Sequence, residues 1–267
     1  MRVGVVQLCS GTDVAKNIET TSHLIRQAAA GGARFIATPE MTHLLEKDKQ
    51  SLFKSIREEH KDLGVSAFAS LAKELDVYLL IGSLAVKAGD KVANRSYVFG
   101  PNSEIVAKYD KIHLFDAQVS DTESYRESAT YIGGKTPQLV TVDNAQIGLS
   151  ICYDLRFANL YRHYAKAGAQ ILTVPAAFTV PTGQAHWDVL LRARAIETSS
   201  FVIAPAQGGH HQDGRKTYGH SKVINPWGEV IAEIDHDRPD FSCVDIDVSE
   251  VDKARCRIPA WNSEQNW

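Results

Sequence analysis

Apolar runs separated by amphipathic stretches recur along the chain, in the pattern that predicts alternating strands and helices. Residues 2–8 are mostly apolar, as in a buried strand, and residues 17–30 place apolar side chains at helical spacing. A pair of glycines ends this helix, and the stretch 33–41 predicts a second short strand that ends at Pro39 and leaves Glu40 just beyond it. Strand, helix and strand in this order predict a βαβ unit with parallel strands.

The remainder of the chain continues this alternation and adds hairpins. The expected elements are strands at 77–86, 147–151, 171–178, 201–207 and 241–248, helices at 65–75 and 186–198, a helix that follows residue 152 and ends at Gly168, and hairpins at 93–111 and 217–234. Residues 111–137 are polar and irregular, which is typical of a functional loop, and the polar tail at 252–267 is expected to dock on the body or on a second subunit. We therefore expect a single α/β domain over residues 1–267, with a mixed sheet or two sheets.

Composition narrows the class of partner. The 267 residues are 44% hydrophobic and carry a net charge of −3, without basic clusters, so small molecules are expected as partners rather than nucleic acid or a membrane surface. No apolar run is as long as a membrane span, and the amino terminus lacks the features of a signal peptide. The four cysteines are widely spaced, which predicts neither a disulfide framework nor a zinc ribbon and suits the cytoplasm.

The first candidate catalytic residue is Cys152, which follows the apolar run 147–151 and precedes a polar stretch. Ligands of open α/β sheets bind at the carboxyl ends of strands, so a thiol there can meet a substrate, although a buried structural cysteine is the alternative. A thiol nucleophile needs a base and donors for the oxyanion. His113 and His220 have polar surroundings, but neither ends a strand as Glu40 does. A buried Glu40 beside Lys111 can also serve as a base.

Three stretches then suggest a family. FIATPEM around Glu40, KYDKIHLFD around Lys111 and GLSICYDLRF around Cys152 resemble the signature motifs of the nitrilase superfamily, the carbon–nitrogen hydrolases with a Glu-Lys-Cys triad. They occur in the family's order and spacing, and the similarity continues through TGQAHWDVLLRARAIET and YGHSKVINPWGEV. The resemblance implies a four-layer α-β-β-α sandwich and catalysis without a metal or cofactor.

The resemblance also implies a role for each residue. Cys152 would attack an amide carbonyl to form a thioester, Glu40 would relay protons, and Lys111 with the backbone N–H of Tyr153 would hold the oxyanion. The family carries a second glutamate between the lysine and the cysteine. Glu127 matches that position.

Several further residues have competing interpretations. Glu123 is the nearby alternative to Glu127 as the second glutamate. Arg156, four residues after the cysteine, is expected to bind a substrate carboxylate in a bidentate manner. The adjacent His210 and His211 are expected to be exposed rather than metal ligands.

Within the superfamily, the chain is similar to the branch of small amidases related to deaminated glutathione amidase, with the omega-amidases that act on 2-oxoglutaramate as near neighbours. We therefore expect hydrolysis of a small linear amide that carries a carboxylate. Relatives pair across a helical face near the cysteine, which implies a homodimer or a larger homo-oligomer. The alternative of another class is a non-catalytic binding protein in which Cys152 senses oxidants.

Overall fold

Two β-sheets form the centre of the molecule. The computed structural model describes residues 1–119, 124–263 and 265. The first sheet consists, in spatial order, of β17 (Asp240–Asp245), β1 (Arg2–Gln7), β2 (Phe35–Ala37), β3 (Tyr78–Ala88), β4 (Lys91–Phe99) and β5 (Ile105–Asp110), with β8 (Tyr131–Ile132) beside β4. The second consists of β16 (Val230–Glu233), β15 (Lys222–Ile224), β12 (Phe201–Ala204), β11 (Ile171–Thr173), β10 (Ala145–Leu149) and β9 (Leu139–Val142).

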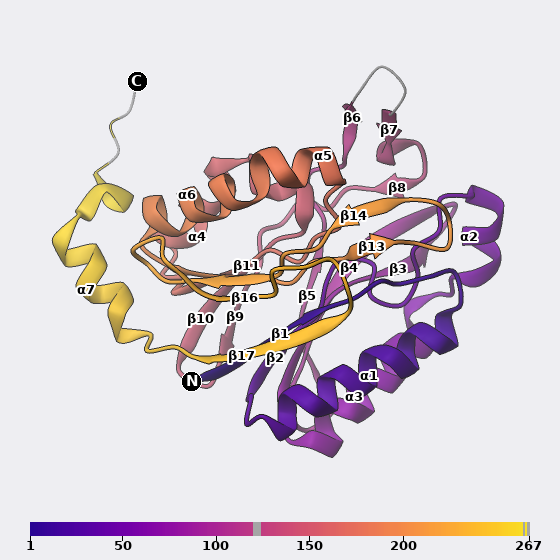
Figure 1. Cartoon of the computed structure of the whole chain (residues 1–267), viewed down its shortest axis with the longest axis horizontal. Coiled ribbons are helices and arrows are strands. Elements are labelled where there is room, and N and C mark those ends of the chain that lie inside the picture. Colours follow the sequence, from indigo (N-terminus) through magenta and orange to yellow (C-terminus); the bar gives the residue numbers. More distant parts are fainter. Residues whose placement is uncertain (120–123, 264, 266–267) are drawn as a thin grey trace.

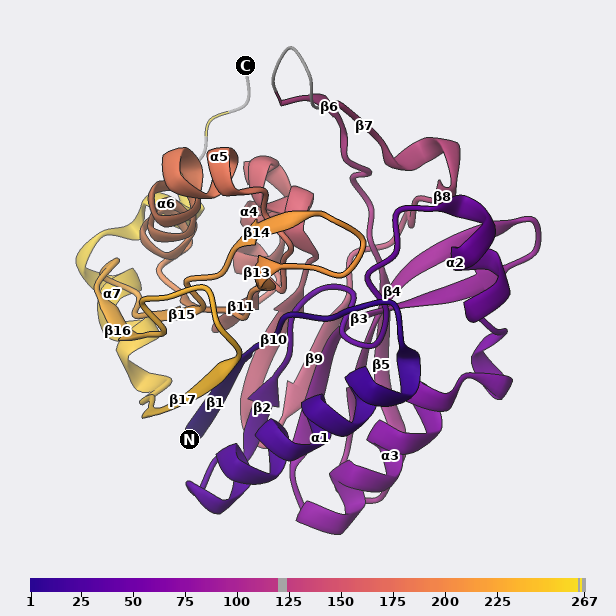
Figure 2. The ribbon, with the colours of Figure 1, turned by 45° about the vertical axis from the view of Figure 1, so that its right-hand side comes forward.

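Helices cover the outer face of each sheet (Figures 1 and 2). Helices α1 (Val14–Ala30) and α3 (Leu63–Leu75) pack on the first sheet, while α4 (Ala158–Lys166) and α6 (Asp188–Thr198) pack on the second. Between the sheets, Leu80 of the first and Ile147 of the second belong to one buried cluster. The expected four-layer α-β-β-α sandwich is therefore confirmed.

The predicted βαβ unit is present. Strand β1 pairs in parallel with β2, and β2 in parallel with β3. Helix α1 begins at Val14 rather than at residue 17, because Asp13 caps it by accepting a hydrogen bond from the Lys16 N–H at 3.1 Å. In the second sheet, β10, β11 and β12 are likewise parallel, so strand ends from both sheets gather at one side of the sandwich.

The structure adds elements in the two regions expected to be irregular. The segment 111–137 contains a small hairpin, β6 (Asp116–Gln118) and β7 (Ser124–Arg126), and a 3₁₀ helix at Glu127–Ala129. The polar tail contains helix α7 (Ser249–Arg257), and Arg255 of this helix donates a hydrogen bond to the Ala169 carbonyl at 2.6 Å. The tail therefore docks on the body. Nowhere in the described ranges is a helix both long enough and apolar enough to cross a membrane.

Candidate active site

Glu40, Lys111 and Cys152 all lie just beyond strand ends. Glu40 follows β2 and Lys111 directly follows β5, both in the first sheet, whereas Cys152 follows β10 in the second. Their side chains meet in one buried place, since Glu40, Lys111 and Cys152 are only 4%, 2% and 9% exposed. The structure thus brings together the three residues that the motifs singled out.

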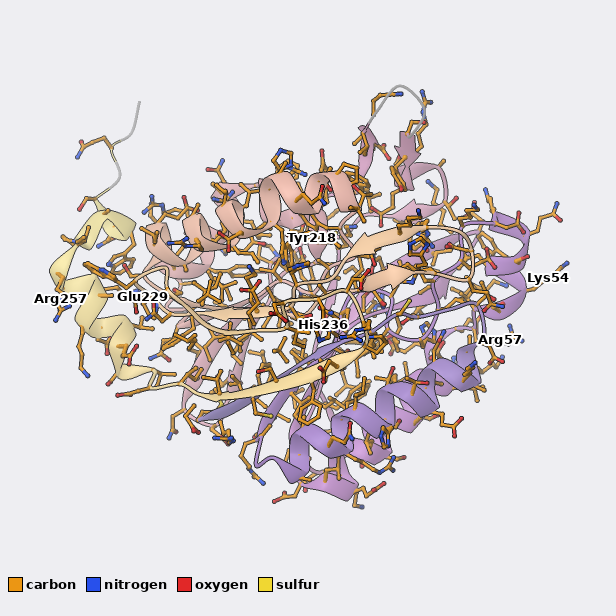
Figure 3. The ribbon with its side chains drawn as sticks, in the orientation of Figure 1. Lys54, Arg57, Tyr218, Glu229, His236 and Arg257 are labelled. Atoms are coloured by element: carbon orange, nitrogen blue, oxygen red, sulfur yellow. The ribbon has the colours of Figure 1, made fainter. Side chains whose placement is uncertain are left out.

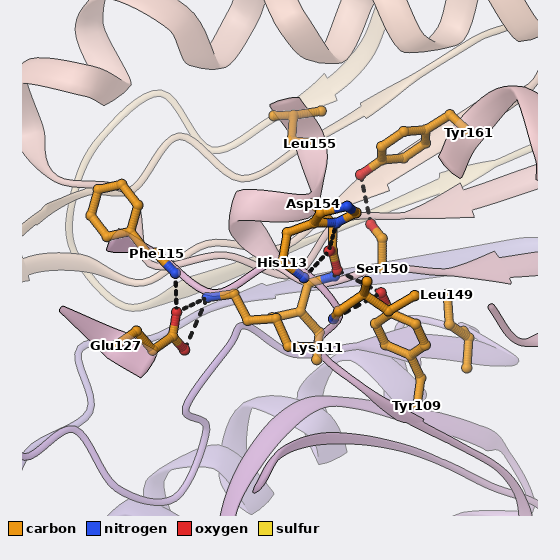
Figure 4. A network of polar contacts seen from close by, with 12 residues as sticks. Tyr109, Lys111, His113, Phe115, Glu127, Leu149, Ser150, Asp154, Leu155 and Tyr161 are labelled. Carbon is orange, nitrogen blue, oxygen red and sulfur yellow. Dashed lines mark hydrogen bonds and ion pairs between the residues drawn. The ribbon is translucent and has the colours of Figure 1, made fainter. Parts of the chain in front are cut away.

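The Lys111 ammonium forms ion pairs with two carboxylates in this cluster. Lys111 Nζ lies 2.8 Å from Glu40 Oε1 and 2.9 Å from Glu127 Oε2. Asn94 Nδ2 donates to Glu40 Oε1 at 2.8 Å and to Glu127 Oε1 at 3.2 Å. The Phe115 N–H donates to Glu127 Oε2 at 2.6 Å (Figure 4). Asn94 was missed from sequence, because β4 contains several polar residues and Asn94 does not stand out among them.

The charges of the cluster favour a resting thiol beside a carboxylate. Burial, and next the negative Glu40, raise the pKa of Cys152 well above its usual value. Burial alone would raise the pKa of Glu40, but Lys111 and hydrogen bonds from Cys152 and Asn94 outweigh this effect and hold the pKa below its usual value. Burial alone would lower the pKa of Lys111, but Glu127 and Glu40 raise it well above its usual value. The Glu40 carboxylate is therefore ionised and hydrogen-bonded to the thiol, as a base for Cys152 would have to be.

A sharp turn presents the thiol. Cys152 has a φ of +49°, in the left-handed region that a residue with a Cβ adopts only at a cost of about 1–2 kcal/mol. Its N–H donates to the Pro175 carbonyl at 2.9 Å, which holds the turn against β11. A 3₁₀ helix at Cys152–Arg156 follows, so Tyr153 lies in a first turn, where backbone N–H groups lack intrahelical acceptors.

The cluster lies in a cavity of about 490 Å³, a size that suits a small-molecule ligand. Its wall includes Glu40, Lys111, Glu127 and Cys152, together with the aromatic Phe115 and Tyr131 and basic side chains from three further segments. These features are sufficient for acyl transfer, because a nucleophile, a base and a cationic oxyanion donor share one partly dry site.

Comparison with known proteins assigns the family. The family model described as carbon-nitrogen hydrolase matches residues 2–256. The chain belongs to the carbon–nitrogen hydrolase family. The predicted resemblance to the nitrilase superfamily is thereby confirmed.

Individual relatives resemble this hydrolase over almost its whole length. It is 36% identical over 264 residues to a deaminated glutathione amidase of Synechocystis, which covers 96% of this chain and 94% of that one. It is 33% identical over 265 residues to the human omega-amidase, covering 99% of this chain and 95% of that one. The crystal structure of the C. elegans NitFhit protein matches with a TM-score of 0.90 and 32% identity, covering 99% of this chain and 65% of that longer protein.

A buried carboxylate joins the lysine and cysteine segments of this hydrolase (Figure 4). Asp154 is fully buried, and its Oδ2 accepts hydrogen bonds from the Tyr109 hydroxyl at 2.7 Å and the Ile151 N–H at 2.8 Å. Its Oδ1 accepts from the His113 N–H at 3.0 Å and lies 2.6 Å from His113 Nδ1. Tyr109 and His113 flank Lys111, and Ile151 precedes the cysteine.

We expect Asp154→Asn to lower kcat at least about 10-fold with a smaller change in KM. The amide nitrogen would face hydrogen-bond donors, and each buried donor left unpaired costs about 1–3 kcal/mol. Steady-state kinetics and the melting temperature test this, with the exposed Asp245→Asn as control. An unchanged kcat in a folded Asp154→Asn hydrolase would contradict a link between the two segments.

Not every expected residue lies at the cluster. Arg156 Nη2 is 3.2 Å from His186 Nδ1, and its guanidinium lies 5.6 Å from the Phe178 ring centroid. Among the described residues, Arg156 is not part of the cavity wall, and its role stays a prediction. Glu123 lies outside the described residues. The expectation that His211 is exposed is wrong, because it is buried between the Ser10 carbonyl and the Thr217 hydroxyl.

Proposed function

We propose that this hydrolase is an amidase that cleaves deaminated glutathione through a cysteine thioester. The observation that carries the proposal is the contact of Glu40, Lys111 and Cys152 at the wall of one cavity. The choice of substrate is supported by the 36% identity to the Synechocystis deaminated glutathione amidase over almost the full length of both chains.

In the proposed reaction, Cys152 Sγ attacks the amide carbonyl as its proton passes to Glu40. The tetrahedral oxyanion is held by the Lys111 ammonium and the Tyr153 N–H. The C–N bond then breaks, Glu40 returns the proton to the departing amine, and the acyl group remains on sulfur as a thioester. Water attacks the thioester carbonyl and gives a proton to Glu40. The C–S bond then breaks, Glu40 returns the proton to Cys152 Sγ, and the carboxylic acid leaves. Glu127 would orient Lys111 and the attacking water.

The proposal also covers the domain organisation, the oligomeric state and the cellular location of the enzyme. One proposal is a single domain over residues 1–267. Another is a homodimer, because the apolar side chains of Val189 and Ile196 on α6 and of Trp227 are 65%, 55% and 50% exposed. A cytoplasmic location is proposed because the cysteines are free thiols, which suits a reducing compartment.

We expect the purified protein to hydrolyse deaminated glutathione with a higher kcat/KM than 2-oxoglutaramate when the two are assayed side by side. The omega-amidase alternative rests on the 33% identity to the human enzyme. A wide margin in favour of 2-oxoglutaramate would make that alternative correct. If no amide in a broad panel released an amine or ammonia, the amidase proposal would fail and a thiol-sensing role would be favoured.

Arg156→Lys should lower kcat/KM for either carboxylated substrate about 10-fold or more, since an ammonium cannot reproduce a bidentate guanidinium contact. The proposed contact is with the carboxylate of the acyl half. A neutral amide of equal length is the control: it should be a poor substrate and respond little to the substitution. Equal turnover of the neutral amide by the original protein would contradict carboxylate recognition by Arg156.

A further inference from the structure

Positive charge gathers on the cavity wall away from the catalytic cluster. The basic side chains there are Lys47, Lys49, Arg126, Arg215 and Lys216. In the described part of the wall, Glu46 is the one acidic side chain besides the two catalytic-site glutamates. A chain with a net charge of −3 therefore presents a locally cationic surface at this cavity, which favours an anionic ligand.

Arg215 is held so that its terminal nitrogens remain available. Its Nε donates to Asp213 Oδ2 at 2.6 Å, and its backbone N–H donates to Asp213 Oδ1 at 3.0 Å. The Asp213 side chain is only 1% exposed, so the partner is itself fixed. Across the described residues, neither Nη1 nor Nη2 of Arg215 makes a hydrogen bond to protein. A guanidinium engaged only through Nε can offer both Nη groups to one carboxylate.

Lys47 approaches the same place from another segment. Its Nζ lies 3.4 Å from the position that a Cβ on Gly214 would occupy, directly beside Arg215 in the chain. Lys47 is exposed and has no ion pair within the described ranges. Both side chains belong to the wall of one cavity, and an anion bound there would be attracted by the positive charge of each.

The position of the two cations relative to the thiol indicates which half of a substrate they would meet. Cys152 is 9% exposed, whereas the Arg215 side chain is 28% exposed and Lys47 is exposed, so the two cations are more open to solvent than the thiol. During turnover the acyl half stays bonded to sulfur, and the leaving half must move outward. The outer wall therefore contacts the leaving group.

We propose that Arg215 and Lys47 bind the carboxylate of the leaving group in a peptide-like amide substrate. This specificity site rests on the proposed function and adds the part of the substrate that the cavity would recognise. Arg215 would contribute its two Nη groups in a bidentate contact, and Lys47 would contribute a point charge. Deaminated glutathione releases a dipeptide with such a carboxylate. 2-Oxoglutaramate releases ammonia, which has no carboxylate, so this site would not contribute to its binding.

The first test compares Lys47→Met and Arg215→Met on both substrates. Each should lower kcat/KM for deaminated glutathione roughly 10-fold or more, mainly through KM, and leave 2-oxoglutaramate unaffected. Lys54→Met is the matched control, because Lys54 is an exposed lysine at the outer edge of α2 (Lys49–Ser55) that points away from the body (Figure 3). Equal losses on both substrates would overturn the proposal, because the cations would then act on the acyl half or on the fold.

The second test does not depend on turnover. Calorimetry on the Cys152→Ala protein compares deaminated glutathione with the analogue whose C-terminal carboxylate is an amide. The acid should bind about 10-fold or more tightly than the amide, and the difference should shrink when Lys47→Met is added. Lys47 is exposed, so this variant remains informative if Arg215→Met leaves Asp213 buried without a partner and unfolds. Equal binding of acid and amide would overturn the proposal, whereas absent turnover by the original protein would overturn only the proposed function.

Discussion

Cys152→Ala is expected to abolish amide hydrolysis, with a loss of kcat of roughly 10⁴-fold or more, because the thioester cannot form. The fold should persist, since the substitution removes a single sulfur atom and retains the backbone contact of Cys152 N–H with the Pro175 carbonyl. Product release under steady-state conditions measures the loss, and the thermal unfolding curve checks the fold. Retained turnover in the Cys152→Ala protein would end the proposed mechanism.

The other cysteines provide the matched controls. Within the described structure, Cys9, Cys243 and Cys256 do not belong to the wall of the catalytic cavity, so their replacement by alanine should leave most of the activity. Mass spectrometry of the protein quenched during turnover should find an added acyl group on the peptide that contains Cys152. An acyl group on any other cysteine would assign the nucleophile elsewhere.

Glu40→Gln and Lys111→Met should each lower kcat/KM by roughly 10²–10³-fold or more. Glutamine cannot accept the thiol proton, and methionine removes both the oxyanion donor and the charge that Glu40 and Glu127 share. Lys108→Met is the control for the lysine, because Lys108 lies on β5, the strand that Lys111 follows, but pairs with Glu59 at 3.0 Å. Near-normal activity of Glu40→Gln would assign the base to another group.

The pH profile separates the two roles. Glu40 acts as a base only when ionised, so activity should fall as the pH drops through its pKa. Lys111 and the surrounding hydrogen bonds hold this pKa below its usual value against the effect of burial. In Lys111→Met, the lost positive charge raises the pKa of Glu40, so the acid limb of the residual activity should shift to higher pH. An acid limb at the same pH in both proteins would show that Lys111 does not act on the charge of Glu40.

Residues at strand ends could be located from the sequence, because an apolar run defines where a buried strand stops. Glu40 and Cys152 were found in this way, with Lys111 at the start of the irregular loop. The contacts of Asn94 and Asp154 could not be assigned, because the sequence pattern does not give the strand order of a sheet or the packing of two sheets. Asn94 contacts Glu40 within the first sheet, whereas Asp154 contacts Tyr109 between the two sheets. Helix α7 was missed because few of its side chains are buried, and a mostly polar segment has little hydrophobic periodicity.

The placement of Arg156 shows how local geometry changes a prediction based on spacing. In an α-helix, a residue four positions along lies about 40° around the axis, nearly above the first. Cys152–Arg156 is instead a 3₁₀ helix, in which four positions correspond to about 120°. Arg156 lies near Phe178 and His186, and the arginines in the described part of the cavity wall are Arg126 and Arg215, the latter from the turn before β14 (Lys216–Tyr218).

Glu40 and Lys111 extend from one sheet and Cys152 from the other, so neither half of the sandwich contains a complete catalytic group. The nucleophile meets its base only while the two sheets are packed in their native alignment. Turnover should therefore depend strongly on that alignment. A shift of one sheet relative to the other would abolish activity even if each sheet stayed intact, before spectroscopy detected unfolding. A partly assembled chain would lack the triad for the same reason, so amide hydrolysis is expected only after the two sheets have packed together.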